Sequence, residues 1–192
     1  MRRAFVTLVT NADFALGAGA LVRSLRETGT AAEIVVMHTG GVPDASLRAL
    51  EARGARLVAV DLLPTSDAFD ARHARDRIHG LHPFTRGEKP PFHTPLDNFA
   101  KLRLWELPFD RVVFLDADAL VLRPIDRLFD YPELSAAPNV YESLSDFHRM
   151  NSGVFTARPD GATFGRLLAA LDAPGAFWRR TDQTFLQAAF PD

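Results

Sequence analysis

Two aspartates, Asp116 and Asp118, interrupt an apolar segment at residues 112–122 (VVFLDADALVL). A continuous apolar segment of this length is typical of a strand that is buried on both faces, as in a parallel sheet. Side chains two residues apart on an extended strand point to the same side, so both carboxylates can converge on one point. Carboxylate oxygens bind hard divalent cations, whose open coordination positions are commonly filled by substrate phosphates. The spacing therefore predicts a site for Mn²⁺ or Mg²⁺; the alternative is a turn at the strand end, in which the aspartates cap a helix.

The elements around this segment alternate between strand-like and helix-like patterns. Segments rich in β-branched, aromatic or small apolar residues predict further strands at residues 4–10, 33–38, 56–61, 135–138 and 150–156. Amphipathic segments predict helices at residues 14–29, 43–53, 71–78, 96–107 and 160–171, and a last helix from 181 onward. Strands that alternate with helices form βαβ units with right-handed crossovers. The sequence predicts an α/β fold of Rossmann type, with a mostly parallel central sheet and helices on both faces.

Polar residues stand at the expected starts of several helices. Asp13 is predicted to cap the first helix, Thr94 or Asp97 the helix at residues 96–107, and Thr181 the last one. These side chains would accept hydrogen bonds from backbone N–H groups that have no partner within the helix.

Ligands of a parallel α/β sheet bind beyond the carboxyl ends of its strands. Three polar segments follow predicted strands and are expected at this edge: residues 10–13 (TNAD), 38–41 (HTGG) and 116–118 (DAD). Asn11 could bind a base or a ribose, or could be a simple turn residue. A dinucleotide-binding loop is not predicted, because Gly17 and Gly19 lie inside the first helix and Val22 stands where a third glycine is needed. The sequence contains neither a P-loop nor the Gly-x-Ser-x-Gly motif of hydrolases.

Length, net charge and cysteine content exclude several classes of protein. A chain of 192 residues is most simply one domain with a sizeable core. A net charge of -2 gives no electrostatic basis for binding nucleic acid or an anionic membrane. The absence of cysteine excludes disulfides, zinc–thiolate sites and cysteine nucleophiles, and is consistent with a reducing compartment. No apolar segment is as long as a membrane span, and the chain starts directly with a strand pattern, so we expect a cytoplasmic protein.

Residues 62–95 form a basic insertion rich in proline and histidine. Apart from one short helical pattern, the segment has no clear periodicity and is too long for a passive connection. It is expected to be either a lid over a ligand or a solvated insertion. Its histidines lack a convincing metal-binding spacing and are expected to be exposed in the loop: His73, His79, His82 and His93.

Five segments, in order, give the chain a family resemblance. They are residues 5–11 (FVTLVTN), 98–105 (NFAKLRLW), 113–121 (VFLDADALV), 151–155 (NSGVF) and 182–183 (DQ). In these segments the chain resembles family 8 glycosyltransferases, the glycogenin and galactinol synthase type, over nearly its whole length apart from residues 62–95. The resemblance implies a GT-A-like fold and a hexosyltransferase that moves a sugar, with retention of configuration, from a nucleotide diphosphate donor. The donor of this family is usually a UDP-sugar.

The resemblance also implies roles for individual residues. Asp116 and Asp118 would bind Mn²⁺ and, through it, the donor diphosphate, while Lys101 would contact the phosphates. Asp182 and Gln183 would face the donor sugar, with Asp182 as the group that stabilises oxocarbenium charge or acts as a transient nucleophile. The remaining donor contacts would come from Leu8, Thr10, Asn11, Phe14, Ala117 and Asn151.

Each of these roles has a simpler structural alternative. Lys101 could lie on a solvated helix face, Asn151 could be a turn residue, and Asp182 could interact with the dipole of the last helix.

The resemblance is incomplete at one point. The family's third metal ligand is a histidine in a His-x-x-Gly-x-x-Lys-Pro type of segment, and no such segment follows Asp182. We therefore expect a single domain, residues 1–192, that lacks a C-terminal segment of the family. A non-catalytic domain that binds a nucleotide sugar is the alternative function. The acceptor (a carbohydrate, a lipid or a small molecule), the donor sugar and the oligomeric state do not follow from the sequence.

Overall fold

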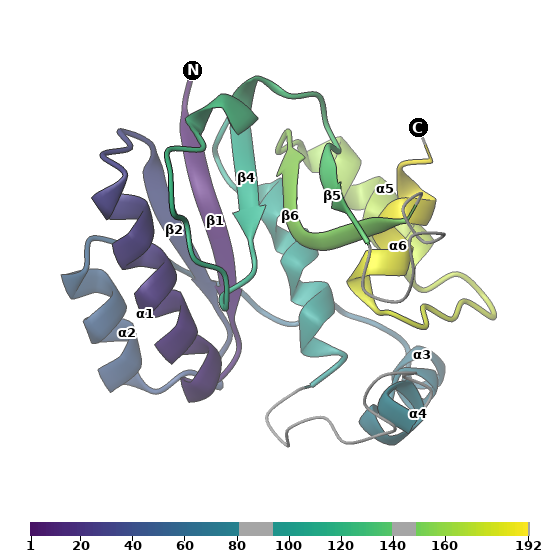
Figure 1. Ribbon diagram of the computed structural model, residues 1–192. Coiled ribbons are helices and arrows are strands. Elements are labelled where there is room, and N and C mark those ends of the chain that lie inside the picture. The colour runs from purple at the N-terminus through teal and green to yellow at the C-terminus, as the bar shows by residue number, and fades with distance from the viewer. Residues whose placement is uncertain (81–93, 140–148, 192) are drawn as a thin grey trace.

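A six-stranded sheet lies between two layers of helices in the computed structural model, which describes residues 1–80, 94–139 and 149–191 (Figure 1). The strand order is β3-β2-β1-β4-β6-β5. The strands are β1 (Arg3–Val9), β2 (Glu33–His38), β3 (Arg56–Ala59), β4 (Arg111–Leu115), β5 (Ala136–Pro138) and β6 (Met150–Ala157). Strands β3, β2, β1 and β4 pair in parallel, whereas β6 is antiparallel to both of its neighbours. The predicted mostly parallel α/β sheet is confirmed.

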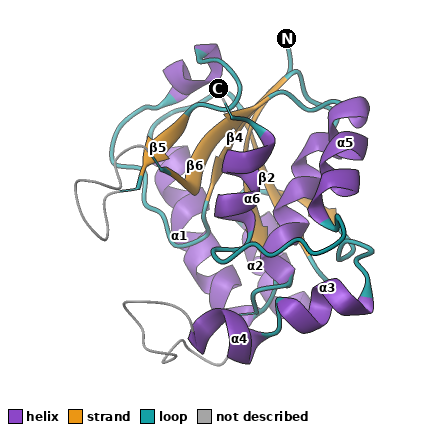
Figure 2. Cartoon of the chain, turned by 90° about the vertical axis from the view of Figure 1, so that its right-hand side faces the viewer, coloured by secondary structure: helices purple, strands orange, loops and turns teal. Residues whose placement is uncertain are grey.

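Helices cover both faces of this sheet. Helices α1 (Ala12–Glu27) and α2 (Asp44–Ala52) pack on one face, and η1 (Asp97–Glu106), α5 (Gly161–Leu171) and α6 (Asp182–Ala189) pack on the other (Figure 2). Shorter helices are α3 (Asp67–Arg72), α4 (Arg75–Gly80) and the 3₁₀ turn η2 (Asp126–Asp130). Alternate side chains of β1 enter the two core layers, Phe5 and Val9 on the α1 side and Val6 and Leu8 on the η1 side. Burial of both faces is why β1 is apolar at nearly every position between Ala4 and Val9. None of the helices in the described segments has the length and apolar character of a membrane span.

Strand β4 is shorter than the apolar pattern predicted. It ends at Leu115, and Asp116 starts a turn that is closed by a hydrogen bond from the Ala119 N–H to the Asp116 carbonyl at 3.0 Å. The second apolar segment is not a strand, since Leu120 and Leu122 are 63% and 88% exposed. The prediction of two carboxylates on one extended strand is therefore wrong. The alternative, a turn at the strand end, is what the structure shows, although these aspartates cap no helix.

The chain leaves the sheet after this turn because it packs along α1 instead. The Val121 N–H donates to the Ser24 hydroxyl at 3.0 Å, and the Thr30 hydroxyl donates to Asp126 at 2.5 Å. The buried Val121 side chain joins the core layer beneath α1. Apolar residues in this segment thus serve helix packing rather than strand pairing.

The caps of the first and last helices differ from those predicted. Asn11, not Asp13, caps α1, and its Oδ1 accepts from the N–H groups of Asp13 and Phe14 at 3.0 and 3.1 Å. Thr181 precedes α6 as expected but makes no capping hydrogen bond with its side chain. Its backbone adopts φ 47°, a region that is costly for a residue with a branched side chain.

The described part of the insertion forms two short helices, α3 and α4, rather than the single helix predicted at residues 71–78. His73, between them, is fully buried, so the prediction of an exposed histidine is wrong at this position. Its ring stacks on Phe69 at 4.0 Å between centroids and on Phe177 at 5.4 Å. Residues 81–93, with His82 and His93, lie outside the described residues.

The buried position of His73 predicts a pH-dependent stability. Burial lowers the pKa of His73, with Arg72 acting in the same direction; the Phe69 carbonyl, Asp70 and Asp172 oppose it. Above about pH 6.5, histidine is neutral in both the folded and the unfolded chain, and its contribution to stability is complete. As the pH falls below that value, the unfolded chain takes up the proton first, so the free energy of unfolding decreases.

Urea unfolding between pH 8 and pH 5 measures this loss. His73→Gln should lose less stability than the wild type over the same range, because glutamine has no proton to gain. Parallel stability curves for the two proteins would contradict the assignment.

Candidate active site

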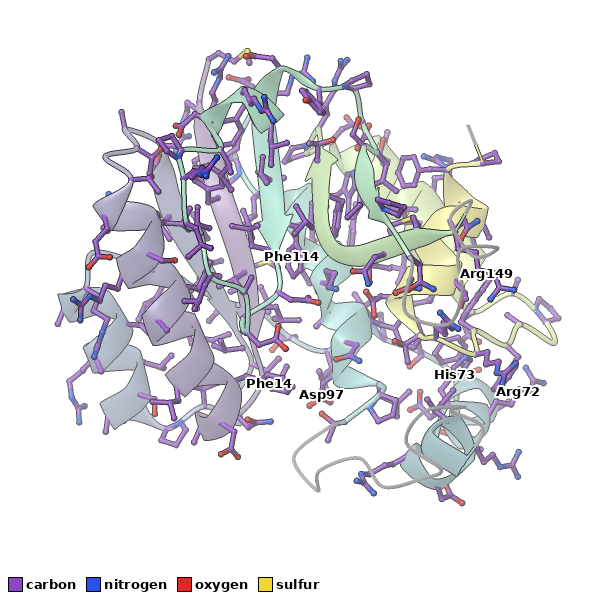
Figure 3. The ribbon with its side chains drawn as sticks, viewed as in Figure 1. Phe14, Arg72, His73, Asp97, Phe114 and Arg149 are labelled. Carbon is purple, nitrogen blue, oxygen red and sulfur yellow. The ribbon has the colours of Figure 1, made fainter. Side chains whose placement is uncertain are left out.

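The sheet topology brings four chain segments to one edge. Strands β1, β2 and β4 end at this edge, and β6 begins there because it runs antiparallel to β4. The Asp116 N–H donates to the Gly153 carbonyl at 2.8 Å, and the Thr39 hydroxyl donates to the Thr10 carbonyl at 3.3 Å. Figure 3 shows Phe14 at the start of α1 and Asp97 at the start of η1 on the same lower edge in that view. The predicted convergence of polar segments at this edge is confirmed.

Lys101 lies at the centre of this edge. Its Nζ donates to Asp182 Oδ2 at 2.7 Å, to Asp116 Oδ1 at 3.1 Å and to the Ser152 carbonyl at 3.2 Å. The ammonium also lies 4.5 Å from the centroid of the Phe114 ring, a favourable cation–π contact. Only 6% of the Lys101 side chain is exposed, so the alternative of a solvated helix face is wrong.

The local structure of η1 explains why Lys101 points inward. The helix predicted at residues 96–107 is present at residues 97–106 and is a 3₁₀-helix, and neither Thr94 nor Asp97 caps it. The Thr94 hydroxyl instead donates to the Asp97 carboxylate at 2.5 Å. Six residues of η1, spread around its circumference, are buried: Phe99, Ala100, Lys101, Leu102, Leu104 and Trp105. A helix that is enclosed in this way must also bury its lysine, which then requires carboxylate partners.

The charges of this cluster stabilise one another. Burial alone would lower the pKa of Lys101, but Asp116 and Asp182 outweigh it, and the pKa of Lys101 is raised. Partial burial raises the pKa of Asp116, with Asp182 and Asp118 acting in the same direction, and Lys101 only partly offsets these effects. The Asp182 side chain is 6% exposed and that of Asp116 is 46% exposed. The Lys101 ammonium therefore links an inner carboxylate to one that faces solvent.

Three glycines allow the backbone to approach this edge closely. A Cβ atom on Gly153 would lie 3.0 Å from Asp116 Oδ2 and 2.9 Å from Asn151 Oδ1. One on Gly17 would lie 2.7 Å from the Ala117 carbonyl oxygen, and one on Gly41 would lie 2.5 Å from the Thr10 carbonyl oxygen. The contacts at Gly17 and Gly41 are with backbone atoms, so any side chain there would displace the backbone, whereas those at Gly153 are with the ends of two side chains that can move.

The other predicted site residues are distributed around the cluster. Asn151 lies in strand β6, and its Oδ1 accepts a hydrogen bond from the Gly153 N–H at 2.8 Å, so the alternative of a simple turn residue is wrong. Asp118 is exposed, and Gln183 is partly exposed in the first turn of α6. The remaining residues lie at the end of β1, at the start of α1 or in the aspartate turn: Leu8 (in the core), Thr10, Asn11, Phe14 and Ala117.

Sequence reasoning missed four parts of the cluster. They are the Ser152 carbonyl, Gly153, the Phe114 ring, and the Thr181 hydroxyl, which donates to Asp182 Oδ1 at 2.9 Å. Gly153 alone had a usable signal, because a glycine inside a strand pattern often marks a close approach of another group.

The two aspartates of the turn are chemically suited to a hard divalent cation. Both are carboxylates, and they are close enough for Asp118 to contribute to the raised pKa of Asp116. Within residues 1–80, 94–139 and 149–191, no three His, Cys, Asp or Glu side chains gather in a metal-binding group. A cation held by Asp116 and Asp118 would take its other ligands from a donor phosphate, from water or from elsewhere.

Known proteins are similar to this chain in sequence. Residues 5–186 match the family "Glycosyl transferase family 8". The chain is 37% identical to human glycogenin-1 over 176 residues, which cover 91% of this chain and 45% of glycogenin-1. It is 31% identical to UDP-glucuronate:xylan alpha-glucuronosyltransferase 2 of Arabidopsis thaliana over 170 residues, which cover 88% of this chain and 24% of that protein. The chain spans less than half the length of these relatives.

Solved glycosyltransferases share the fold. The galactosyltransferase LgtC, solved in complex with donor and acceptor sugar analogs, superposes with a TM-score of 0.63 at 18% identity over 97% of this chain and 70% of that one. GlyE of Streptococcus pneumoniae superposes with a TM-score of 0.63 at 19% identity over 100% of this chain and 44% of that one. These similarities establish a GT-A fold, and the family match over residues 5–186 shows that this chain belongs to glycosyl transferase family 8.

Proposed function

We propose that this chain forms the donor-binding and catalytic part of a retaining hexosyltransferase that uses a UDP-sugar. The observation that carries the proposal is the Lys101 ammonium, held at 3.1 Å from Asp116 and at 2.7 Å from Asp182. A buried cation between two carboxylates at the ligand-binding edge of a GT-A fold is suited to a reaction that moves charge onto a leaving diphosphate. Family membership and the UDP-sugar in the name of the Arabidopsis relative support the same reaction.

Each charged residue then has a distinct task. Asp116 and Asp118 would hold Mn²⁺ or Mg²⁺, which supplies Lewis-acid stabilisation of the leaving diphosphate when bound. Lys101 stays protonated because its pKa is raised, so it can donate a hydrogen bond to a phosphate oxygen as the glycosidic bond breaks. Asp182 presents its carboxylate from the start of α6, where it can stabilise positive charge on the sugar or form a transient covalent bond.

Other residues would bind and orient the donor. Thr10, Asn11 and Phe14 follow β1 at the same edge as the aspartate turn, and they would bind the nucleoside. Leu8 has its side chain in the core, which leaves its backbone for such a contact. Ala117 would contribute backbone beside the ribose, and Asn151 and Gln183 would face the sugar.

Thermal unfolding with nucleotides tests the donor site. We expect UDP, but not GDP, CMP or NAD, to raise the melting temperature, and only when Mn²⁺ is present. A ligand at 100 times its Kd stabilises the native state by about 2.7 kcal/mol. The double variant Asp116→Asn/Asp118→Asn should lose the shift, because amides bind a divalent cation poorly.

Asp130→Asn is the matched control, because Asp130 is exposed and pairs with Arg3 at the start of β1, away from the aspartate turn. It should keep the full response to UDP and Mn²⁺. No shift with millimolar UDP and Mn²⁺ would contradict the proposal. Binding of UDP without hydrolysis of any UDP-sugar would instead support the alternative, a non-catalytic domain that binds a nucleotide sugar.

A further inference from the structure

The loop at residues 172–181 between α5 and α6 determines where Asp182 lies. Two hydrogen bonds tie its first residue to the insertion: Asp172 accepts from the Ser66 N–H at 2.6 Å and from the Ser66 hydroxyl at 3.0 Å. Further along, the Trp178 N–H donates to His73 Nε2 at 2.8 Å. Figure 3 shows Arg72 and His73 where α3 meets this loop. The described start of the insertion therefore holds the loop that leads to Asp182 by these hydrogen bonds.

Both ring nitrogens of His73 form hydrogen bonds in this contact, and its ring packs against other aromatic rings. A backbone N–H can only donate, so Nε2 is the acceptor and Nδ1 carries the proton, which it donates to the Phe69 carbonyl at 3.0 Å. The ring is stacked with Phe69 and Phe177 and meets the edge of Phe99 at 5.5 Å. His73 is fully buried, so both nitrogens depend on these partners.

Trp178 connects His73 to the residues around Asp182. Its carbonyl accepts from the Thr181 N–H at 2.9 Å, and its indole N–H donates to the Leu171 carbonyl at 2.9 Å. Its ring meets the edge of Phe185 in α6 at 5.1 Å. Thr181 has φ 47° and is buried, and its hydroxyl donates to Asp182. A backbone conformation of this kind persists only where its surroundings hold it.

We infer that His73 is a positioning residue for Asp182: by accepting the Trp178 N–H, it holds the loop at residues 172–181 in the conformation that directs Asp182 at Lys101. The importance of this contact for catalysis rests on the proposed function of Asp182. The contact itself does not depend on the proposed function, because the hydrogen bond joins two described segments 105 residues apart whether or not the protein transfers a sugar. The described start of the insertion would then position Asp182 by holding the loop at residues 172–181. This role differs from both roles expected from the sequence, a lid over a ligand and a solvated insertion.

Two substitutions separate the hydrogen bond from the packing. His73→Phe keeps an aromatic ring in the stack but leaves the Trp178 N–H without an acceptor. His73→Gln offers an amide oxygen at about the place of Nε2. Hydrogen–deuterium exchange should be at least about tenfold faster in residues 173–183 of His73→Phe than in the wild type, because a buried donor has lost its partner. His73→Gln should restore most of the protection.

Helix α1 is the internal control in the same molecules. Its exchange should be unchanged, since α1 packs on the opposite face of the sheet. Equal protection of the loop in wild type and His73→Phe would overturn the inference. Faster exchange in the loop and in α1 together would also overturn it, because that result indicates general destabilisation.

Turnover provides the second measurement. In hydrolysis of the UDP-sugar that the wild type cleaves fastest in a panel with Mn²⁺, His73→Phe should lower kcat about tenfold or more while the UDP-induced thermal shift stays near that of the wild type, because small displacements of a catalytic group are costly. His73→Gln should recover kcat. An unchanged kcat in His73→Phe would overturn the catalytic part. If the wild type neither binds UDP nor hydrolyses the donor, the proposed function fails, and the exchange measurement still decides whether His73 holds the loop.

Discussion

Replacing Lys101 with methionine should destabilise the protein by about 3–5 kcal/mol, the cost of leaving a buried charge without its partner. The Asp182 carboxylate is 6% exposed and receives its shortest hydrogen bond, 2.7 Å, from Lys101. Methionine fills much of the same space over the Phe114 ring but offers no positive charge. Urea unfolding at pH 7 measures the difference from the wild type.

Two further proteins show whether the charge is responsible. Arg23→Met removes an ion pair of similar length, 2.8 Å, from the exposed surface of α1, and should cost much less, because solvent screens exposed charges. The double variant Lys101→Met/Asp182→Asn should be more stable than Lys101→Met alone, because the uncompensated carboxylate is gone. A loss in Lys101→Met no larger than that in Arg23→Met would show that the cluster does not need the ammonium.

Substituting Asp182 with asparagine should reduce donor hydrolysis by at least about 100-fold, the effect typical of losing one electrostatic contact in a transition state. Asparagine has the shape of aspartate and can still accept a hydrogen bond from Lys101, but it cannot balance positive charge on the sugar or form the transient bond. Initial rates with a panel of UDP-sugars and Mn²⁺ measure the change.

Binding should separate from turnover in this variant. The UDP-induced thermal shift of Asp182→Asn should remain within the range of the wild type, because Asp116 and Asp118 are intact. Asp130→Asn should retain full turnover. If Asp182→Asn hydrolysed UDP-sugars at the rate of the wild type, the assignment of Asp182 to the sugar side of the site would have to be withdrawn.

The local sequence pattern alone predicted most of the helices and strands that carry the site residues. Strand β2 was predicted at residues 33–38 and is found at Glu33–His38, and α5 begins after Asp160, whose carboxylate caps it. Strands buried on both faces must be apolar throughout, and helices that cover a sheet must be amphipathic, so both leave a signal in consecutive residues. The order of the family's five segments likewise predicted family membership.

Tertiary structure alone decided which of those residues meet. Lys101 and Asp182 are separated by 81 residues, and His73 and Trp178 by 105. Their contacts follow from the antiparallel placement of β6, the enclosure of η1 and the docking of α3 against the α5–α6 loop. The turn after Leu115 could not be predicted for the same reason. An apolar residue such as Val121 gives the same sequence pattern whether it lies in a strand or packs beneath α1. Burial is a property of the whole fold. The pattern of neighbouring residues indicates that a side chain is buried, but it does not indicate which residues the side chain packs against.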